Sequence, residues 1–176
     1  PQRPHIVHRL DANTSGVMVL CKRKRVASIV QKQFENRTVR KTYLARVHGH
    51  PNLDQFSCDA ALRREADAGG IRLLDPQGDE ASTGFEVVRR LNDSTSLIRC
   101  FPKTGRTNQI RVHLWSMAFP ICCDPAYLPE NELGNNRTLL PGEPTMCLHA
   151  ESIAFKDHDG KLLHFSDAAP AWAMLE

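Results

Sequence analysis

The sequence predicts an α+β fold, in which a mixed, largely antiparallel β-sheet carries a few flanking helices. About seven short segments have the apolar or alternating composition of β-strands, whereas only two have helical periodicity. Short turn sequences such as residues 92–94 (NDS) separate consecutive strands, as in β-hairpins. The helices do not alternate regularly with the strands, which argues against a doubly wound parallel sheet.

The first part of the chain predicts a strand, a helix and a second strand. Residues 16–22 (GVMVLCK) are apolar and follow a glycine, which favours a strand. Residues 22–37 place apolar side chains at helical spacing with cations on the other face, and Asn36 is a plausible helix end. Residues 39–49 alternate, so that Lys41 and Tyr43 share one face of a strand.

The rest of the chain predicts mainly hairpins. Residues 83–91 and 95–101 form one predicted hairpin, and residues 147–155 and 161–168 form the last one. A short strand over 56–62 and a charged loop over 63–80 precede the first hairpin, and an irregular loop over 124–145 precedes the last. Between them, a short helix begins near Thr107, which is placed to cap it. His113 lies on the apolar stripe of this helix and is expected in the core.

Length and composition indicate one globular domain over residues 1–176. The chain opens PQRPH without a methionine, so we expect an N-terminally truncated catalytic domain. No run of about 18 apolar residues is present, which excludes a membrane-spanning helix. The six cysteines form no CxxC pair, which predicts free thiols in a reducing, cytoplasmic-type compartment. Their spacing with His149 does not fit a zinc site.

The charge is unevenly distributed along the chain, although its net value is only +3. Residues 1–50 hold eleven Lys and Arg residues and only two acids, Asp11 and Glu35. A basic segment on a nearly neutral chain suggests a polyanion partner such as nucleic acid. A solvated basic helix without a partner is the alternative explanation.

Four segments carry the candidate chemistry: HRLDANTSG at 8–16, KTYLARVHG at 41–49, GRTNQIRVHL at 105–114 and LHAESIAF at 148–155. Taken alone, Asp11 in the first segment is a typical turn residue. In this order, however, the four segments resemble the RluA-type pseudouridine synthase family over nearly the whole chain. The resemblance implies isomerisation of uridines to their C-glycoside in structured rRNA or tRNA.

The resemblance also implies a role for individual residues. Asp11 matches the catalytic nucleophile, Tyr43 the tyrosine that stacks on the flipped uracil, and Arg111 the basic residue that pairs with the catalytic aspartate. Arg9 matches the arginine that enters the RNA stack, and Leu148 matches an apolar residue of the uracil pocket. A nearby guanidinium would favour the charged form of Asp11.

Further cations are candidates for RNA phosphate contacts, namely Arg106, Lys22 and Arg23. The reaction involves no redox change and no external group, so we expect no cofactor and no metal. RNA is the expected partner, with no membrane, and the protein is expected to be a monomer.

Two departures from the family pattern bear on the site. Asn108 stands where the family commonly has histidine, and Cys123-Asp124 replaces a more usual glycine-aspartate. A second hypothesis is therefore an RNA-binding module that keeps the synthase fold without catalysis. The presence of Asp11, Tyr43 and Arg111 together favours the enzyme, because a pure binder of a polyanion does not need a carboxylate in its site.

Overall fold

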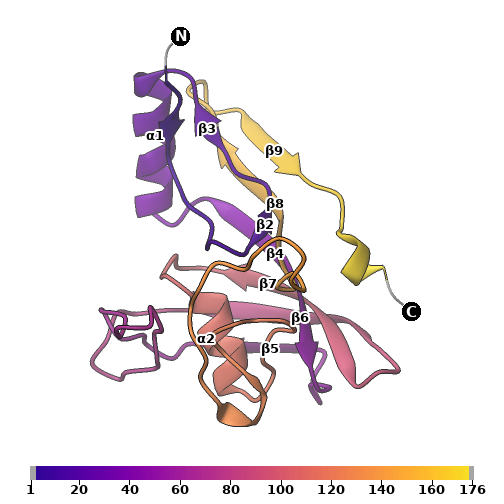
Figure 1. Ribbon diagram of the computed structural model, residues 1–176. Coiled ribbons are helices and arrows are strands. Elements are labelled where there is room, and N and C mark those ends of the chain that lie inside the picture. Colours follow the sequence, from indigo (N-terminus) through magenta and orange to yellow (C-terminus); the bar gives the residue numbers. More distant parts are fainter. Residues whose placement is uncertain (1–2, 175–176) are drawn as a thin grey trace.

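The centre of the molecule is a seven-stranded sheet (Figure 1). Six of its strands follow the order β2-β8-β4-β7-β6-β5, and the seventh, β9, pairs with β8. The computed structural model describes residues 3–174. The strands are β1 His5–Ile6, β2 Ser15–Gly16, β3 Leu20–Cys21, β4 Arg40–His48, β5 Gln55–Cys58, β6 Thr83–Arg90, β7 Thr95–Pro102, β8 Leu148–Lys156 and β9 Leu162–Ser166. The β2–β8 pair is parallel, and the other pairs in this sheet are antiparallel. The predicted α+β class with a mixed, largely antiparallel sheet is confirmed.

The two helices are α1, Lys24–Glu35, and α2, Gln109–Ser116; short 3-10 turns cover Pro129–Asn131 and Ala171–Ala173. Helix α1 ends at Asn36, as predicted. Helix α2 starts later than predicted, because Asn108 and not Thr107 precedes it, in a left-handed conformation with φ 59°. The prediction of a Thr107 cap was therefore wrong. None of the helices within residues 3–174 is long and apolar enough to cross a membrane.

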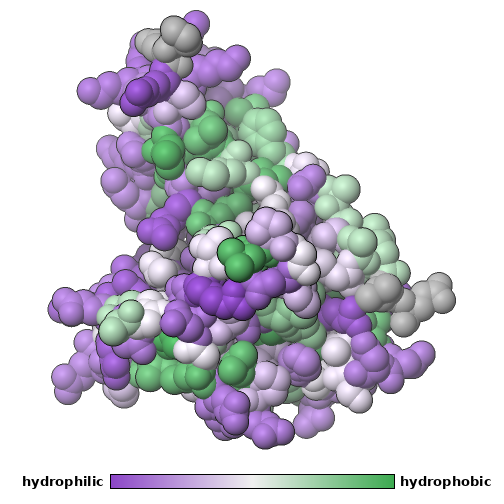
Figure 2. Space-filling model, in the orientation of Figure 1, coloured by the Kyte–Doolittle hydropathy of each residue, from purple (hydrophilic) through white to green (hydrophobic). Residues whose placement is uncertain are grey.

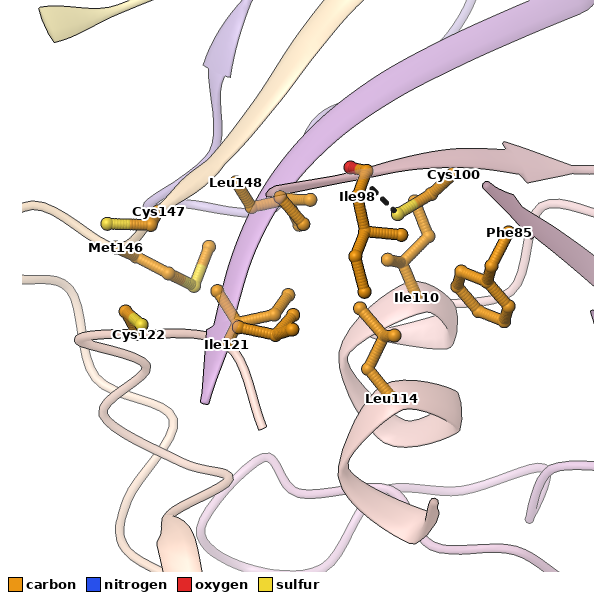
Figure 3. Close-up of a cluster of buried hydrophobic side chains, with 12 residues drawn as sticks. Phe85, Ile98, Cys100, Ile110, Leu114, Ile121, Cys122, Met146, Cys147 and Leu148 are labelled. Atoms are coloured by element: carbon orange, nitrogen blue, oxygen red, sulfur yellow. Dashed lines mark hydrogen bonds between the residues drawn. The ribbon is translucent and has the colours of Figure 1, made fainter. Parts of the chain in front are cut away.

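The main core lies between the sheet and α2. Figure 3 shows Ile110 and Leu114 pointing from α2 toward Ile98 of β7 and Phe85 of β6. Burying these side chains contributes about 1.5–3 kcal/mol each to folding. The same cluster contains Leu148 at the start of β8, which lies close to the functional site described below.

A second core joins α1 to the sheet. Val30 of α1 is fully buried against a cluster that includes Val7, Ile153 of β8 and Phe155. Together α1, β1, β3 and the far end of β8 form an arm that rises from the main sheet (Figure 1). Figure 2 shows apolar side chains gathered on this arm and on β9. The large apolar side chains exposed there are Ile6, Met18, Leu20, Leu162 and Phe165.

Two of the predicted strands differ from the structure. Residues 16–22 do not form one strand: Gly16 ends β2, residues 17–19 are irregular, and β3 starts at Leu20. The strand predicted at 56–62 is limited to Gln55–Cys58. β2 pairs with β8 in the main sheet whereas β3 pairs with β1 in a separate two-stranded sheet, so the segment changes sheet across residues 17–19. The two predicted hairpins and the loops at 63–80 and 124–145 are present.

Candidate active site

A pocket of about 270 Å³ brings together most of the residues predicted for the site. Its walls come from the segment before β2, from the end of α1, from β4, from residues 102–110 and from the start of β8. Five predicted site residues line it: Arg9, Asp11, Tyr43, Arg106 and Leu148. Segments far apart in the sequence therefore meet at one hollow.

A turn anchored on β8 holds Asp11 in this pocket. The backbone N–H of Thr14 donates to the Asp11 carbonyl at 2.9 Å, which closes the turn. Ser15 and Gly16 then pair in parallel with His149 and Ala150, the two residues after Leu148. Gly16 has φ 106°, and a Cβ there would lie 2.3 Å from the Ala150 carbonyl oxygen, so the turn requires glycine at this position.

The loop at 124–145 braces the same turn from outside. The Asn13 amide donates to the Arg137 carbonyl at 2.8 Å, and its side-chain oxygen accepts from the backbone N–H of Leu139 at 2.9 Å. This long loop therefore fixes the segment that carries Asp11.

Arg111 lies beneath the pocket with its side chain only 2% exposed. Its main partner is Asp124: Nε donates to Oδ2 and Nη2 to Oδ1, both at 2.7 Å. Its Nη1 donates to the Asn108 side-chain oxygen at 2.9 Å and lies 3.9 Å from Oδ2 of Asp11. The predicted pairing with Asp11 is thus present as the longer of the two ion pairs of Arg111. The sequence predicted the contact with Asp11 but not the buried pair with Asp124.

Burial and neighbouring charges shift the pKa of Asp11 in opposite directions. Burial raises its pKa, whereas Arg111, Arg9 and the backbone N–H of Asn108 lower it, and the net direction is upward. The two guanidinium groups do favour the charged form of Asp11, as expected, but the effect of burial on its pKa is larger. A carboxylate with a raised pKa is more basic than an exposed one, which suits a nucleophile.

Tyr43 faces the same pocket from β4. Burial and the neighbouring Asp11 carboxylate raise the pKa of Tyr43 to about 12. Its phenol is therefore protonated at neutral pH, and the ring offers an aromatic face for stacking.

Lys41 lines the pocket two residues before Tyr43 and was not among the predicted site residues. Burial lowers the pKa of Lys41 to about 8, and its Nζ donates to the Thr104 carbonyl at 3.1 Å. The alternation of residues 39–49 already put Lys41 on the same face as Tyr43, and that was the signal that could have identified it.

The remaining predicted cations differ in position. Arg9 is exposed at the pocket rim. Arg106 is also at the pocket, but its guanidinium donates to the Glu80 carbonyl at 3.1 Å and pairs with Asp79 at 3.3 Å. Lys22 and Arg23 do not line the pocket; they are exposed at the start of α1, whose other end supplies Phe34 to the wall.

The six cysteines, His113 and His149 do not line this pocket. His113 is fully buried, hydrogen-bonded to Thr83 at 3.0 Å and to the Ala60 carbonyl at 2.9 Å, as expected of a core histidine. All six cysteines are free thiols. Within residues 3–174, the one group with metal-ligand spacing is Asp157, His158 and Asp159 in the turn after β8, and none of them lines the pocket.

Comparison with known proteins identifies the family. The family model described as RNA pseudouridylate synthase matches residues 1–116. The uncharacterized RNA pseudouridine synthase YlyB of Bacillus subtilis is 35% identical over 170 residues, which cover 96% of this chain and 53% of that protein. The dual-specificity RNA pseudouridine synthase RluA of Vibrio parahaemolyticus is 37% identical over 155 residues, covering 85% of this chain and 59% of that protein. The chain thus spans somewhat more than half the length of these relatives.

Solved structures agree with the sequence comparison. The human RNA pseudouridylate synthase domain containing 4 superposes with a TM-score of 0.77 at 27% identity, over 97% of this chain and 73% of that one. The human domain containing 1 superposes with a TM-score of 0.81 at 24% identity, over 99% and 72% of the two chains, and supports the fold. The matching residues include the segments that carry Asp11, Tyr43 and Arg111. The chain belongs to the RNA pseudouridylate synthase family.

Proposed function

We propose that this chain isomerises uridines to pseudouridine in structured RNA, rRNA or tRNA, with Asp11 as the nucleophile. The observation that carries the proposal is the meeting of Asp11, Tyr43 and Arg111 at one pocket in a chain of this family. Residues 1–176 would act as a single catalytic domain.

The reaction requires one glycosidic bond to break and another to form at the same sugar carbon. The bond from C1′ to uracil N1 breaks, the bond from C1′ to C5 forms, C5 loses a proton and N1 gains one. No electron is transferred and no external group is added, so the proposal needs neither cofactor nor metal. The protein must hold the detached base in place while it turns, which the walls of the pocket support.

The pocket residues divide this work between them. Asp11 attacks the nucleoside, and Arg111, fixed by Asp124, limits the cost of the charge on Asp11. Tyr43 stacks on the uracil, and Leu148 closes the apolar side of the pocket. Arg9, exposed at the rim, fills the gap that the flipped base leaves in the RNA stack.

The proposal extends to the cellular compartment and to the assembly state. The six free thiols support a reducing, cytoplasmic-type compartment. We also propose that the protein acts as a monomer.

Mapping of pseudouridine in total RNA tests the proposal. RNA is incubated with the chain or with its Asp11→Asn variant, and modified sites are located chemically. Sites formed only by the unaltered chain would establish the isomerase and name its substrate. RNA binding by both proteins without modification by either would favour the alternative function, an RNA-binding module with the synthase fold.

A further inference from the structure

A second hollow of about 300 Å³ lies directly beside the active-site pocket. Both hollows are lined by Phe34, Lys41, Thr104, Gly105 and Arg106, so they share a wall and are contiguous. The roles proposed for Asp11, Tyr43 and Arg111 make no use of this second hollow.

The lining of the second hollow is strongly basic. Arg37, Lys41, Lys103 and Arg106 contribute four cations, and Glu35 contributes the single carboxylate. We call this hollow the basic pocket. Its charge selects for an anion, and its volume admits a group larger than a monatomic ion.

The two arginines of the basic pocket are held by acidic neighbours. Arg37 pairs with the Glu80 carboxylate at 3.0 Å, and Arg106 pairs with Asp79 at 3.3 Å while donating to the Glu80 carbonyl at 3.1 Å. Residues 79 and 80 thus fix both guanidinium groups in place. These pairs neutralise part of the positive charge, which leaves the two lysines as the main anion ligands.

The two lysines carry charge that the fold does not compensate. Within residues 3–174, neither Lys41 nor Lys103 forms an ion pair with a carboxylate. Lys41 donates to the Thr104 carbonyl, which places its Nζ in the wall between the two pockets. Lys41 is partly buried, and an ammonium group buried without an anion gains by binding one, whereas Lys103 is exposed to solvent and to an approaching strand.

The backbone at Arg37 provides a further indication. Arg37 has φ 56°, in the left-handed region, at the position after α1 where glycine is usual. A non-glycine residue in this conformation costs roughly 1–2 kcal/mol. Arg37 lines the basic pocket, so this conformational cost is consistent with a need for its guanidinium group at that position.

We propose that the basic pocket binds a backbone phosphate of the RNA strand next to the nucleotide held in the active-site pocket, with Lys41 and Lys103 as its ligands. This rests on the proposed function and deepens it. A flipped nucleotide stays covalently linked to the strand, so a phosphodiester must cross the rim of the active-site pocket. The basic pocket is contiguous with that rim and carries the complementary charge.

The salt dependence of RNA binding tests the proposal without relying on turnover. The probe is a single-stranded oligouridylate of ten nucleotides, and its Kd is measured by fluorescence anisotropy over a series of KCl concentrations. Each phosphate contact contributes about 0.7 to the slope of log Kd against log salt for a single strand. Lys103→Gln should therefore lower the slope by about 0.7. Lys161→Gln is the matched control, because Lys161 is exposed and lines neither pocket.

A second probe separates a phosphate contact from a base contact. The loss caused by Lys103→Gln should be the same on an oligocytidylate of equal length, because phosphate contacts carry no sequence information. A slope equal to that of the unaltered chain would overturn the proposal. A loss confined to oligouridylate would overturn it as well, since Lys103 would then contact the base.

The same measurement in the Asp11→Asn background distinguishes this proposal from the isomerase proposal. A slope that depends on Lys103 in both backgrounds, together with no pseudouridine formed by the chain that keeps Asp11, would support the phosphate site and reject the isomerase. If the unaltered chain forms pseudouridine but Lys103→Gln leaves the slope of log Kd against log salt unchanged, the phosphate site alone would be rejected.

Discussion

Arg111 contacts two carboxylates that have different tasks. Asp124 is fully buried and takes both parallel hydrogen bonds of the guanidinium, whereas Asp11 is 22% exposed and lies 3.9 Å away. The close pair fixes Arg111 in the interior. The longer contact leaves the Asp11 oxygens free to approach a substrate.

Removing the charge of Asp124 should therefore destabilise the fold. Asp124→Asn leaves a buried guanidinium without its bidentate partner, and breaking a buried pair in this way costs about 3–5 kcal/mol. Urea-induced unfolding measures the loss. Glu143→Gln is the control, because its pair with Arg137 is on the surface and should matter little. Equal losses in the two variants would contradict a structural role specific to Asp124.

Asp11 should show the opposite effect on stability. Its pKa is raised in the folded state, so its contribution to stability is present at acid pH and is lost as pH rises through that pKa. At pH 7 the ionised, partly buried carboxylate of Asp11 destabilises the fold. Asp11→Asn should therefore raise the free energy of unfolding, although it should abolish isomerisation. Urea unfolding over a pH series from 7 to below 3.8, the ordinary pKa of an aspartate, should show the gain shrinking on acidification. A gain that grows toward acid pH would contradict the assigned direction.

Tyr43 can be separated into its ring and its hydroxyl. Stacking of a base on an aromatic ring contributes about 1–3 kcal/mol, so Tyr43→Ala should lower kcat/KM roughly 5- to 150-fold. Tyr43→Phe keeps the ring and should cost less. Steady-state kinetics on an RNA identified by pseudouridine mapping decides the matter, and equal losses in the two variants would assign the function to the hydroxyl.

At the scale of elements, local pattern predicted the hairpins and α1 but not the contacts between distant loops. The alternating strands and the apolar face of α1 depend on neighbours a few residues away. The burial of Arg111 depends on Asp124. This residue lies in an irregular loop that folds back against α2. The left-handed conformations of Asn108 and Cys123, with φ 59° at each, are likewise imposed by tertiary packing. The family usually has glycine at the position of Cys123. Glycine adopts the left-handed conformation without steric cost, which explains the family's preference.

The start of α1 is arranged against helix stability. Arg23 is the N-cap residue without a side-chain cap, and the first turn contains no acidic residue but includes Lys24 and Arg25. Cations at this end oppose the helix dipole. The prediction that Lys22 and Arg23 contact RNA phosphates would account for the arrangement.

Arg23→Asn should therefore have two opposite effects. An asparagine N-cap should stabilise the protein by about 1 kcal/mol, measured by urea unfolding. If Arg23 contacts a phosphate, the slope of log Kd against log salt for RNA binding should fall by about 0.7. Stabilisation with an unchanged slope would remove Arg23 from the RNA-binding surface.

At the scale of the whole molecule, two separate cores support the two sides of the active-site pocket. The core between the sheet and α2 supports Tyr43 and Leu148. The core of the arm, which includes Val30, supports α1 and with it Phe34 in the pocket wall. Residues 1–50, which contain the excess of Lys and Arg, supply α1 and β4. The basic part of the chain therefore includes the arm that closes one side of the pocket.

This division predicts that the arm opens more readily than the main sheet. Val30 of α1 and Val47 of β4 are both fully buried, and truncating either to alanine should cost about 2 kcal/mol. Val30→Ala should speed hydrogen exchange of α1 amides and leave β7 protected, whereas Val47→Ala should speed exchange in both.

Added RNA should slow exchange in α1, because Phe34 forms part of the pocket wall. Equal acceleration of α1 and β7 by Val30→Ala would show that arm and sheet open as one unit, and RNA contacts would then protect the whole domain together.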